Sequence, residues 1–458
     1  MAQRRGNCRH SVTAVRLDKE KLANQEDRRT EDDFVAARHA AKLVENKVSR
    51  KHPSVWLGTG CALAALFVCN QTRIQAAAPR SRGQINGGMA ATQRDKATPE
   101  AEAHFLKARD AESRSDWAIA QAEYLKALES APTWVEAIVN LGTVYNQAGM
   151  TNDAIEAFNR AIEIDPGLFA GQLNLGITYF KAGRYSEAEP PLRKALALQQ
   201  GNAQAGNLLL LTLFAEEKYA EVAPLAESVL SSAPGSPLAL EMAGRAYFKL
   251  RDYKNAARTL SQRSRSKPES AELYLMLGQS LDNTGDSDAA IGALEKAIAL
   301  SAAAPLPDEH FDLGYILWKQ RQFERAETEF HRELDRDGSH APSIYYLGNI
   351  ALERGDLKSA VALLTTAALA IPDDFAVHYD LGKALLLSGQ APSAIDALRT
   401  AIGLNPKKPD AHYQLGLALR REGQVEEAGK EFERARKLND EERADLERKV
   451  QGKDKKPL

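Results

Sequence analysis

Residues 341–374 read APSIYYLGNIALERGDLKSAVALLTTAALAIPDD, and residues 375–408 read FAVHYDLGKALLLSGQAPSAIDALRTAIGLNPKK. Both stretches carry a Leu-Gly step, a second glycine seven residues further on and a proline two residues before the end. Apolar residues at i, i+4 and i+7 in the second half of each stretch predict one face of a helix. A pattern that recurs at a fixed spacing of about 20–50 residues indicates a repeat protein.

The same spacing extends over residues 101–442 as ten consecutive units, with two extra residues in the 301–306 stretch of the sixth unit. The nth residue of a unit is called its nth place below. The units cover residues 101–134, 135–168, 169–202, 203–236, 237–270, 271–306, 307–340, 341–374, 375–408 and 409–442.

Each unit predicts a first helix, a tight turn and a second helix. The glycine of the Leu-Gly step, such as Gly348, lets two helices approach closely. Glycines such as Gly355 and Gly389 provide the left-handed residue that ends a first helix. A small residue early in the second helix is followed four residues later by a large apolar one in most units, as with Ala154 and Phe158. These features predict an all-α fold.

The ten units resemble the tetratricopeptide repeat (TPR) family. The resemblance implies a right-handed α-solenoid, or superhelix, in which the first helices line a concave groove that binds partner peptides. Two departures put the packing in doubt, because Arg263 and Glu333 stand where a small residue is expected. Pro190, Pro191 and Pro224 lie inside second helices, and we expect them to bend these helices.

The chain has 458 residues and a formal net charge of −2. Residues 1–100 hold 18 Lys/Arg and 10 Asp/Glu, residues 443–458 hold six and three, and residues 101–442 hold the remaining 36 and 49, a net charge of −13. An array with this charge repels phosphate, which argues against nucleic-acid binding. All three cysteines precede residue 70, which excludes a disulfide framework or a cysteine zinc site for the rest of the chain.

The flanking regions have a different composition. We expect residues 1–54 to be a charged, mostly disordered leader, residues 73–100 a flexible linker, and residues 443–458 a capping helix and tail. Residues 55–72 form an uncharged, largely apolar segment with three interpretations: a signal peptide, a transmembrane anchor, or a buried helix, the last being least favoured. The first two predict a membrane-anchored or exported (periplasmic or extracytoplasmic) protein rather than a cytoplasmic one.

No phosphate-binding glycine loop, Gly-x-Ser-x-Gly, His-Glu-x-x-His or Cys-x-x-Cys motif occurs, so we expect no enzymatic activity, cofactor or metal. His104, His310, His378 and His412 all occupy the fourth place of their units. A metal or pH-sensitive site is one interpretation. We favour simple packing of a bulky ring, because no constant spacing to carboxylates is evident.

The family resemblance places the second, fifth, sixth, ninth, twelfth and thirteenth residues of each unit on the concave face. Here these places predict a partner-binding groove with apolar anchors and acidic groups. Its residues are Phe180, Phe214, Phe248, Phe311, Tyr315, Trp318, Tyr345, Tyr379, Tyr413, Asp308, Asp312 and Asp380. The competing interpretation is that these rings fill gaps between adjacent helices.

These features predict a non-enzymatic scaffold that binds a protein or peptide with apolar anchors and some positive charge, in an envelope-associated complex. Two alternatives stay open. One is a regulatory or recruiting subunit of a separately encoded enzyme, such as a glycosyltransferase. The other is a soluble cytoplasmic adaptor.

Overall fold

The computed structural model describes residues 98–266 and 269–453, which lie in the compact unit Ile85–Leu458. The expected leader (1–54), the apolar segment (55–72), residues 73–97 of the linker and the tail (454–458) lie outside these residues. Within the described residues every regular element is a helix, so the predicted all-α class is confirmed. No described helix is both long enough and apolar enough to cross a membrane.

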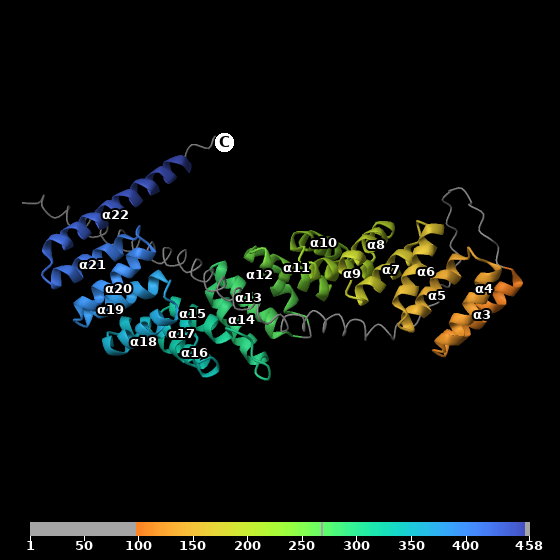
Figure 1. The fold of residues 1–458 in the computed structure, drawn as a ribbon, viewed down its shortest axis with the longest axis horizontal. Coiled ribbons are helices and arrows are strands. Elements are labelled where there is room, and N and C mark those ends of the chain that lie inside the picture. Colours follow the sequence, from red (N-terminus) through yellow and green to blue (C-terminus); the bar gives the residue numbers. More distant parts are fainter. Residues whose placement is uncertain (1–97, 267–268, 454–458) are drawn as a thin grey trace, which may run out of the picture. The chain divides into compact units, whose positions relative to one another are not determined.

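Twenty helices alternate between first and second helices of the ten repeats (Figure 1). The first helices are α3 (Pro99–Ser113), α5 (Val135–Gln147), α7 (Phe169–Lys181), α9 (Ala203–Ala215), α11 (Pro237–Lys249), α13 (Ala271–Asn283), α15 (Glu309–Lys319), α17 (Ala341–Glu353), α19 (Phe375–Leu387) and α21 (Pro409–Arg421). The second helices are α4 (Trp117–Ser130), α6 (Thr151–Ile164), α8 (Tyr185–Leu198), α10 (Tyr219–Ser232), α12 (Tyr253–Arg263), α14 (Ser287–Leu300), α16 (Phe323–Arg336), α18 (Leu357–Ala370), α20 (Ala391–Leu404) and α22 (Val425–Lys453).

The two helices of each repeat are joined by a turn whose fifteenth place has a positive φ. Six of the ten repeats carry glycine there, for example Gly149 with φ 78°. The other four carry side chains in the same left-handed conformation, namely Ser115, Glu217, Arg251 and Arg321. The repeat geometry therefore imposes this conformation even where the residue disfavours it.

The glycine at the eighth place sets the distance between the two helices. A Cβ built on Gly382 would lie 2.5 Å from Leu398 Cγ, and one on Gly142 would lie 2.7 Å from the Phe158 ring. The fourth repeat reverses the sizes: Leu210 replaces the glycine, and Ala226 stands where the other repeats have a large residue. Both residues are fully buried. The helix pair thus needs one small and one large residue, in either order.

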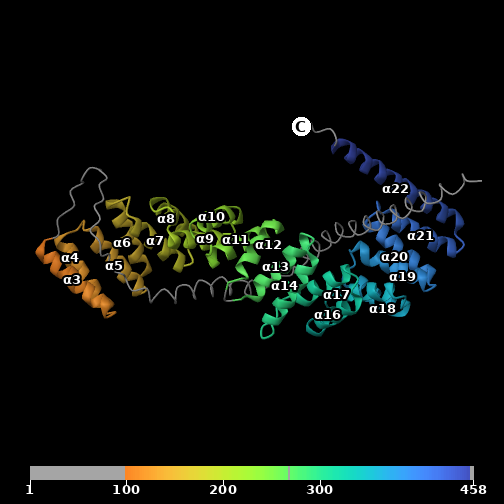
Figure 2. The same cartoon turned by 180° about the vertical axis from the view of Figure 1, so that it is seen from behind.

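The main contacts among the described helices are between neighbours. Each second helix contacts its own first helix and, up to α20, the first helix of the next repeat, and consecutive first helices from α5 onward also contact one another (Figures 1 and 2). The helices α8 and α10 continue through Pro190, Pro191 and Pro224. At the C-terminal end, α22 continues from the tenth repeat through residue 453 as one helix. No glycine or proline occurs between Gly429 and Gly452 to end it.

Candidate partner-binding surface

From α5 to α21 the first helices form a continuous layer, because each of them contacts the next one along the chain. We call the side chains at their second, fifth, sixth, ninth, twelfth and thirteenth places the inner surface. All twelve residues predicted for the groove lie on these helices, except Asp308, which directly precedes α15. Their role in binding stays a prediction, but the structure divides them by accessibility.

The fifth-place aromatic ladder changes from buried to exposed along the chain. Phe311 and Tyr345 are buried, Tyr379 is half-buried, and Tyr413 is 51% exposed. Tyr315 and Trp318, one and two helical turns after Phe311, are also half-buried. The rings that a partner can reach are therefore Tyr315, Trp318, Tyr379 and Tyr413, while Phe311 and Tyr345 lie beneath the surface.

Tyr346 holds the aromatic cluster of the seventh and eighth repeats together. Its ring centroid lies 4.8 Å from that of Trp318, 4.9 Å from Tyr345, and 5.5 Å from both Tyr315 and Phe330. It is almost completely buried. The sequence prediction missed this residue, although two adjacent tyrosines at the fifth and sixth places were visible in the sequence.

Polar side chains link three consecutive first helices beside the cluster. Trp318 Nε1 donates to Asn349 Oδ1 at 2.9 Å, and Asn349 Nδ2 donates to Asp380 Oδ2 at 3.2 Å. Tyr345 Oη donates to the same Asp380 oxygen at 2.7 Å. Burial raises the pKa of the Asp380 carboxyl above its ordinary value, although both hydrogen bonds favour the ionised form. Asp380 is therefore a structural link between repeats and not an exposed acidic contact.

The other two predicted acidic residues differ in the same way. Asp312 is buried and accepts a hydrogen bond from the Gln279 side chain of the preceding repeat. Asp308 is exposed and lies 3.5 Å from His340 Nε2. Of the three predicted acidic contacts, Asp308 is the exposed one.

The twelfth-place phenylalanines of the third to fifth repeats each pair with a ring of their own repeat. Phe180, Phe214 and Phe248 each contact a tyrosine that begins the second helix, with centroid distances of 5.4, 5.2 and 5.8 Å to Tyr185, Tyr219 and Tyr253. All three pairs are edge-on. Phe180 is buried, and the other two phenylalanines are half-buried.

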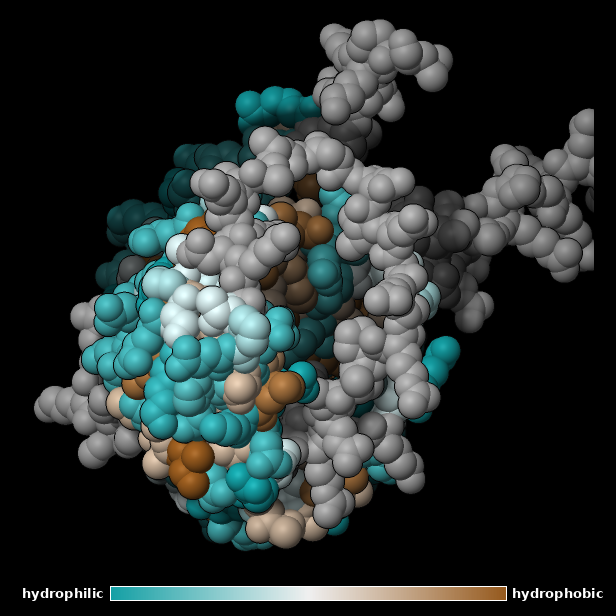
Figure 3. Space-filling view, turned by 90° about the vertical axis from the view of Figure 1, so that its right-hand side faces the viewer, coloured by the Kyte–Doolittle hydropathy of each residue, from teal (hydrophilic) through white to brown (hydrophobic). Residues whose placement is uncertain are grey.

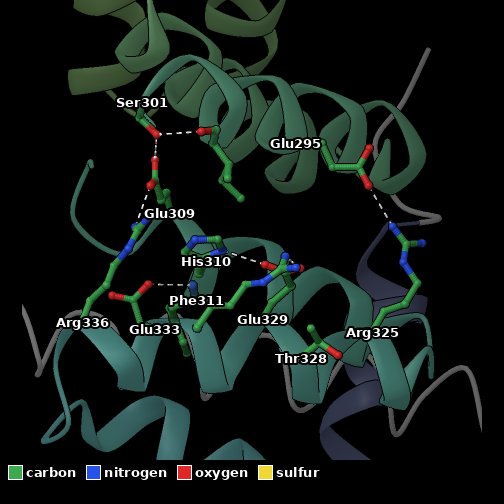
Figure 4. A network of polar contacts seen from close by, with 12 residues as sticks. Glu295, Ser301, Glu309, His310, Phe311, Arg325, Thr328, Glu329, Glu333 and Arg336 are labelled. Carbon is green, nitrogen blue, oxygen red and sulfur yellow. Dashed lines mark hydrogen bonds and ion pairs between the residues drawn. The ribbon is translucent and has the colours of Figure 1, made fainter. Parts of the chain in front are cut away.

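Arg263 and Glu333, the two charged residues at a place where a small residue is expected, each contact the fifth residue of their own repeat. Arg263 Nε lies 3.4 Å from Glu241 Oε2, and Arg263 Nη1 donates to the carbonyl of Ser266. Glu333 Oε2 accepts the backbone N–H of Phe311 at 3.2 Å (Figure 4). Glu333 thereby satisfies the first turn of α15, since the Asp308 side chain makes no cap hydrogen bond. The expected disruption is absent because each charge has a partner.

The fourth-place histidines have a regular partner, so the expectation of no constant carboxylate spacing is wrong. In three repeats a glutamate nineteen residues further on lies 2.6 Å from histidine Nδ1. The pairs are His104–Glu123, His310–Glu329 and His412–Glu431. Each pair joins the first and second helix of one repeat, which supports a packing role. No group of three potential metal ligands occurs within residues 98–266 and 269–453.

One arrangement contains the residue types of a hydrolase triad. Ser343 Oγ lies 2.8 Å from His340 Nδ1, and His340 Nε2 lies 3.5 Å from Asp308 Oδ1. However, Ser343 is fully buried, and its backbone N–H also points to His340 Nδ1 at 3.3 Å. His340 therefore caps the start of α17, and a substrate has no access to the serine.

Together the paired helices, the left-handed turns and the layer of first helices define an α-helical repeat protein. A family model described as "Tetratricopeptide repeat" matches residues 105–168, 241–305, 311–375 and 379–442, and a second model with this description matches residues 145–210 and 351–401. The chain belongs to the tetratricopeptide repeat family. Proteins of this family are in general scaffolds for protein interactions.

Several solved structures resemble parts of the chain. MamA residues 41 to the end from Desulfovibrio magneticus RS-1 is 24% identical over 38% of this chain and 98% of its own, with a TM-score of 0.36. The Naa15/Naa10 complex bound to HypK-THB is 16% identical over 75% of this chain and 64% of its own chain, with a TM-score of 0.40. The APC/C hetero-tetramer Cut9–Hcn1 is 13% identical over 75% of this chain and 94% of its own chain, also with a TM-score of 0.40. No curated protein sequence matches the chain.

Proposed function

We propose that this protein is a non-enzymatic scaffold that binds a protein or peptide partner on the inner surface of its seventh to tenth repeats. The observation that carries the proposal is the accessibility of four aromatic rings on three of the four first helices of these repeats: Tyr315 and Trp318 on α15, Tyr379 on α19 and Tyr413 on α21. Aromatic side chains are the commonest binding hot spots, and partly exposed rings on neighbouring helices can contact one extended ligand.

The rings are supported from beneath, which favours binding. Trp318 is fixed by its ring contact with Tyr346 and by its hydrogen bond to Asn349. Tyr379 stacks on Phe375 at a centroid distance of 5.8 Å. Side chains that are already ordered lose less conformational entropy when a partner binds. Exposed Asp308 and Asp410 lie on the same surface and favour a partner with some positive charge.

The setting that we propose is membrane-anchored or exported, because residues 55–72 are uncharged and largely apolar. An envelope-associated complex agrees with this composition. The recruited partner can itself be an enzyme, in which case the scaffold positions it.

Crosslinked affinity capture from native cells tests the binding proposal. The variant changes Tyr315, Trp318, Tyr379 and Tyr413 to Ser and leaves the buried Phe311 and Tyr345 intact. The matched control places one glutamate on the opposite side of the repeat, at Leu369 of α18, which is 81% exposed. We expect the inner variant to lose a captured protein that the control retains. Equal capture by wild type and inner variant, with equal melting curves, contradicts the proposal.

A further inference from the structure

Consecutive repeats are joined through fixed places. The fifth and ninth places of one repeat meet the sixth place of the next, as Tyr345 and Asn349 meet Asp380 at 2.7 and 3.2 Å. The ninth and sixth places also meet between Gln279 and Asp312. Among the repeats that the structure describes, this pairing leaves two rows without a partner repeat: the fifth and ninth places of the last repeat, and the sixth place of the first.

The exposure of these rows follows the pairing. At the fifth place, nine repeats have a buried or half-buried residue, and Tyr413 of the tenth is 51% exposed. At the sixth place, nine repeats again have a buried or half-buried residue, and Leu106 of the first is 65% exposed. Within residues 98–266 and 269–453 no helix follows α22 to cover α21. Figure 3, which faces the α3–α4 end, shows small hydrophobic patches on a mostly hydrophilic surface.

We propose that the exposed face of α21 binds a second copy of this chain, whose α3 takes the place of the next first helix. The register of the internal repeats then sets Leu106 of one copy against Tyr413 and Leu417 of the other. Leu417, at the ninth place, is half-buried. Two aliphatic side chains and one tyrosine ring leave water together in this contact.

The charges at the two ends complement each other in the same register. Inside the array, Arg354 at the fourteenth place lies 3.1 Å from Glu324 at the eighteenth place of the preceding repeat. The corresponding residues at the junction are Arg114 and Glu426, which have opposite charges.

The twelfth and tenth places also hold residues of opposite charge at the junction. The twelfth place meets the tenth place of the next repeat, as Asn146 donates to Thr178 at 2.7 Å. At the junction these places hold Arg420 and Asp110, which again have opposite charges. Arg109 is the neighbouring cation on α3, and it already interacts with Glu112 on the same helix. The two opposite-charge pairs favour the contact, whereas the twelfth and ninth places, which meet between Trp318 and Asn349, set Arg420 near Arg109. Arg114 and Asp110 lie 2.9 Å apart on α3 and exchange this pairing for Glu426 and Arg420 of the other copy.

The contact uses different surfaces of the two copies, so it does not close into a symmetric dimer. A head-to-tail contact adds copies one after another, and the size of the assembly then depends on concentration. This property separates the proposal from a two-fold contact between two α21 helices.

Sedimentation velocity of the purified full-length chain over a range of concentrations tests the proposal. The variants are Leu106→Glu and Tyr413→Glu, and the matched control is Leu369→Glu on the outer side of α18. We expect the mean mass of wild type and control to rise with concentration. Each end variant should weaken association at least about tenfold, because every junction needs both residues.

An equimolar mixture of the two end variants gives the decisive result. Each mixed pair can form one intact junction, from Leu106 of the Tyr413→Glu copy and Tyr413 of the Leu106→Glu copy. We therefore expect dimers and no larger species. Three results overturn the proposal: wild type whose mass does not depend on concentration, association that both end variants leave unchanged, or association lost in Tyr413→Glu but not in Leu106→Glu. Melting curves of all variants exclude misfolding as the cause.

Discussion

Repeats three to five and repeats seven to nine both carry aromatic residues on their first helices, but they use them differently. Phe180, Phe214 and Phe248 each contact a tyrosine five residues further on in the same repeat. In the seventh and eighth repeats the rings of Tyr315 and Trp318 contact Tyr346 of the following repeat. The ring pairs of the first region therefore lie within one repeat, whereas those around Tyr346 in the second region also join neighbouring repeats.

The difference has a consequence for cooperativity. The stability of a repeat array is approximately the sum of its repeats and of the contacts between neighbours. Large ring contacts and the Asp380 hydrogen bonds strengthen the contacts between repeats seven, eight and nine. We expect this region to unfold as a unit and repeats three to five to unfold more locally.

Removing Tyr346 should have the largest effect. Tyr346→Ala deletes a buried ring with contacts to both repeats, and a loss of about 3–5 kcal/mol in the free energy of unfolding is expected. Phe214→Ala, which removes a half-buried ring, should cost less. Hydrogen exchange should show lost protection across repeats seven and eight in the first variant, and only around repeat four in the second. Lost protection confined to the eighth repeat in Tyr346→Ala would refute the coupling.

Substitution of Gly382, the eighth-place glycine of the ninth repeat, should lower the free energy of unfolding nearly as much as Tyr346→Ala. Gly382→Ala puts a Cβ against Leu398 and should cost about 1–3 kcal/mol, measured by urea unfolding. The matched control is Gly292→Ala in α14, where nothing lies within 4 Å, and it should stabilise by about 0.5–1 kcal/mol. Equal effects of the two substitutions would show that helix separation is not set by this contact.

Asp380 should make the stability of its region depend on pH. Its pKa is raised in the folded state by burial, so the folded protein holds the proton more tightly than the unfolded chain. Its contribution is thus fully present below the ordinary pKa and is lost as pH rises through the folded-state pKa. Relative to Asp380→Asn, wild type should lose at most about 1.4 kcal/mol per pH unit in this window. A difference that grows in favour of wild type as pH rises would contradict the burial argument.

A substitution in a left-handed turn should change the free energy of unfolding least. The turn of the fifth repeat, at Arg251, provides the test. Arg251 has φ 60° where six other repeats have glycine. Arg251→Gly should stabilise by about 0.5–1 kcal/mol, because the left-handed strain is relieved. Gly149→Ala makes the opposite change at the same place in the second repeat, and thermal unfolding of both variants should show shifts of opposite sign.

Most of the fold could be predicted from the sequence, because the information was repeated ten times. The glycine equivalent to Gly348 recurs in eight of the ten repeats and those equivalent to Gly355 and Pro372 in six each, so that each exception could be compared with its counterparts. The sequence shows that Leu210 and Ala226 differ from their counterparts in the other repeats. That one compensates for the other became clear only from the structure, where both are fully buried in the same helix pair.

The partner-binding surface was less predictable, because a residue's place within the repeat does not determine how exposed its side chain is. Phe311 and Tyr413 share the fifth place, yet one is buried and the other is half exposed. Phe311 lies against the ring of Tyr346 in the next repeat, whereas in the described part of the chain no helix follows α22 to cover Tyr413. The histidine–glutamate pairs were missed because their partners lie nineteen residues apart, a separation that matches neither one helical turn nor one repeat.

The central claim is that a partner contacts the inner surface of repeats seven to ten. Placing a photoreactive amino acid at Tyr379, and separately at Leu369 on the outer side, tests this contact directly in intact cells. We predict that illumination attaches the same protein at position 379 in every preparation and does not attach it at position 369. Crosslinks from position 369 alone, or the same protein captured equally from both positions, would contradict the account.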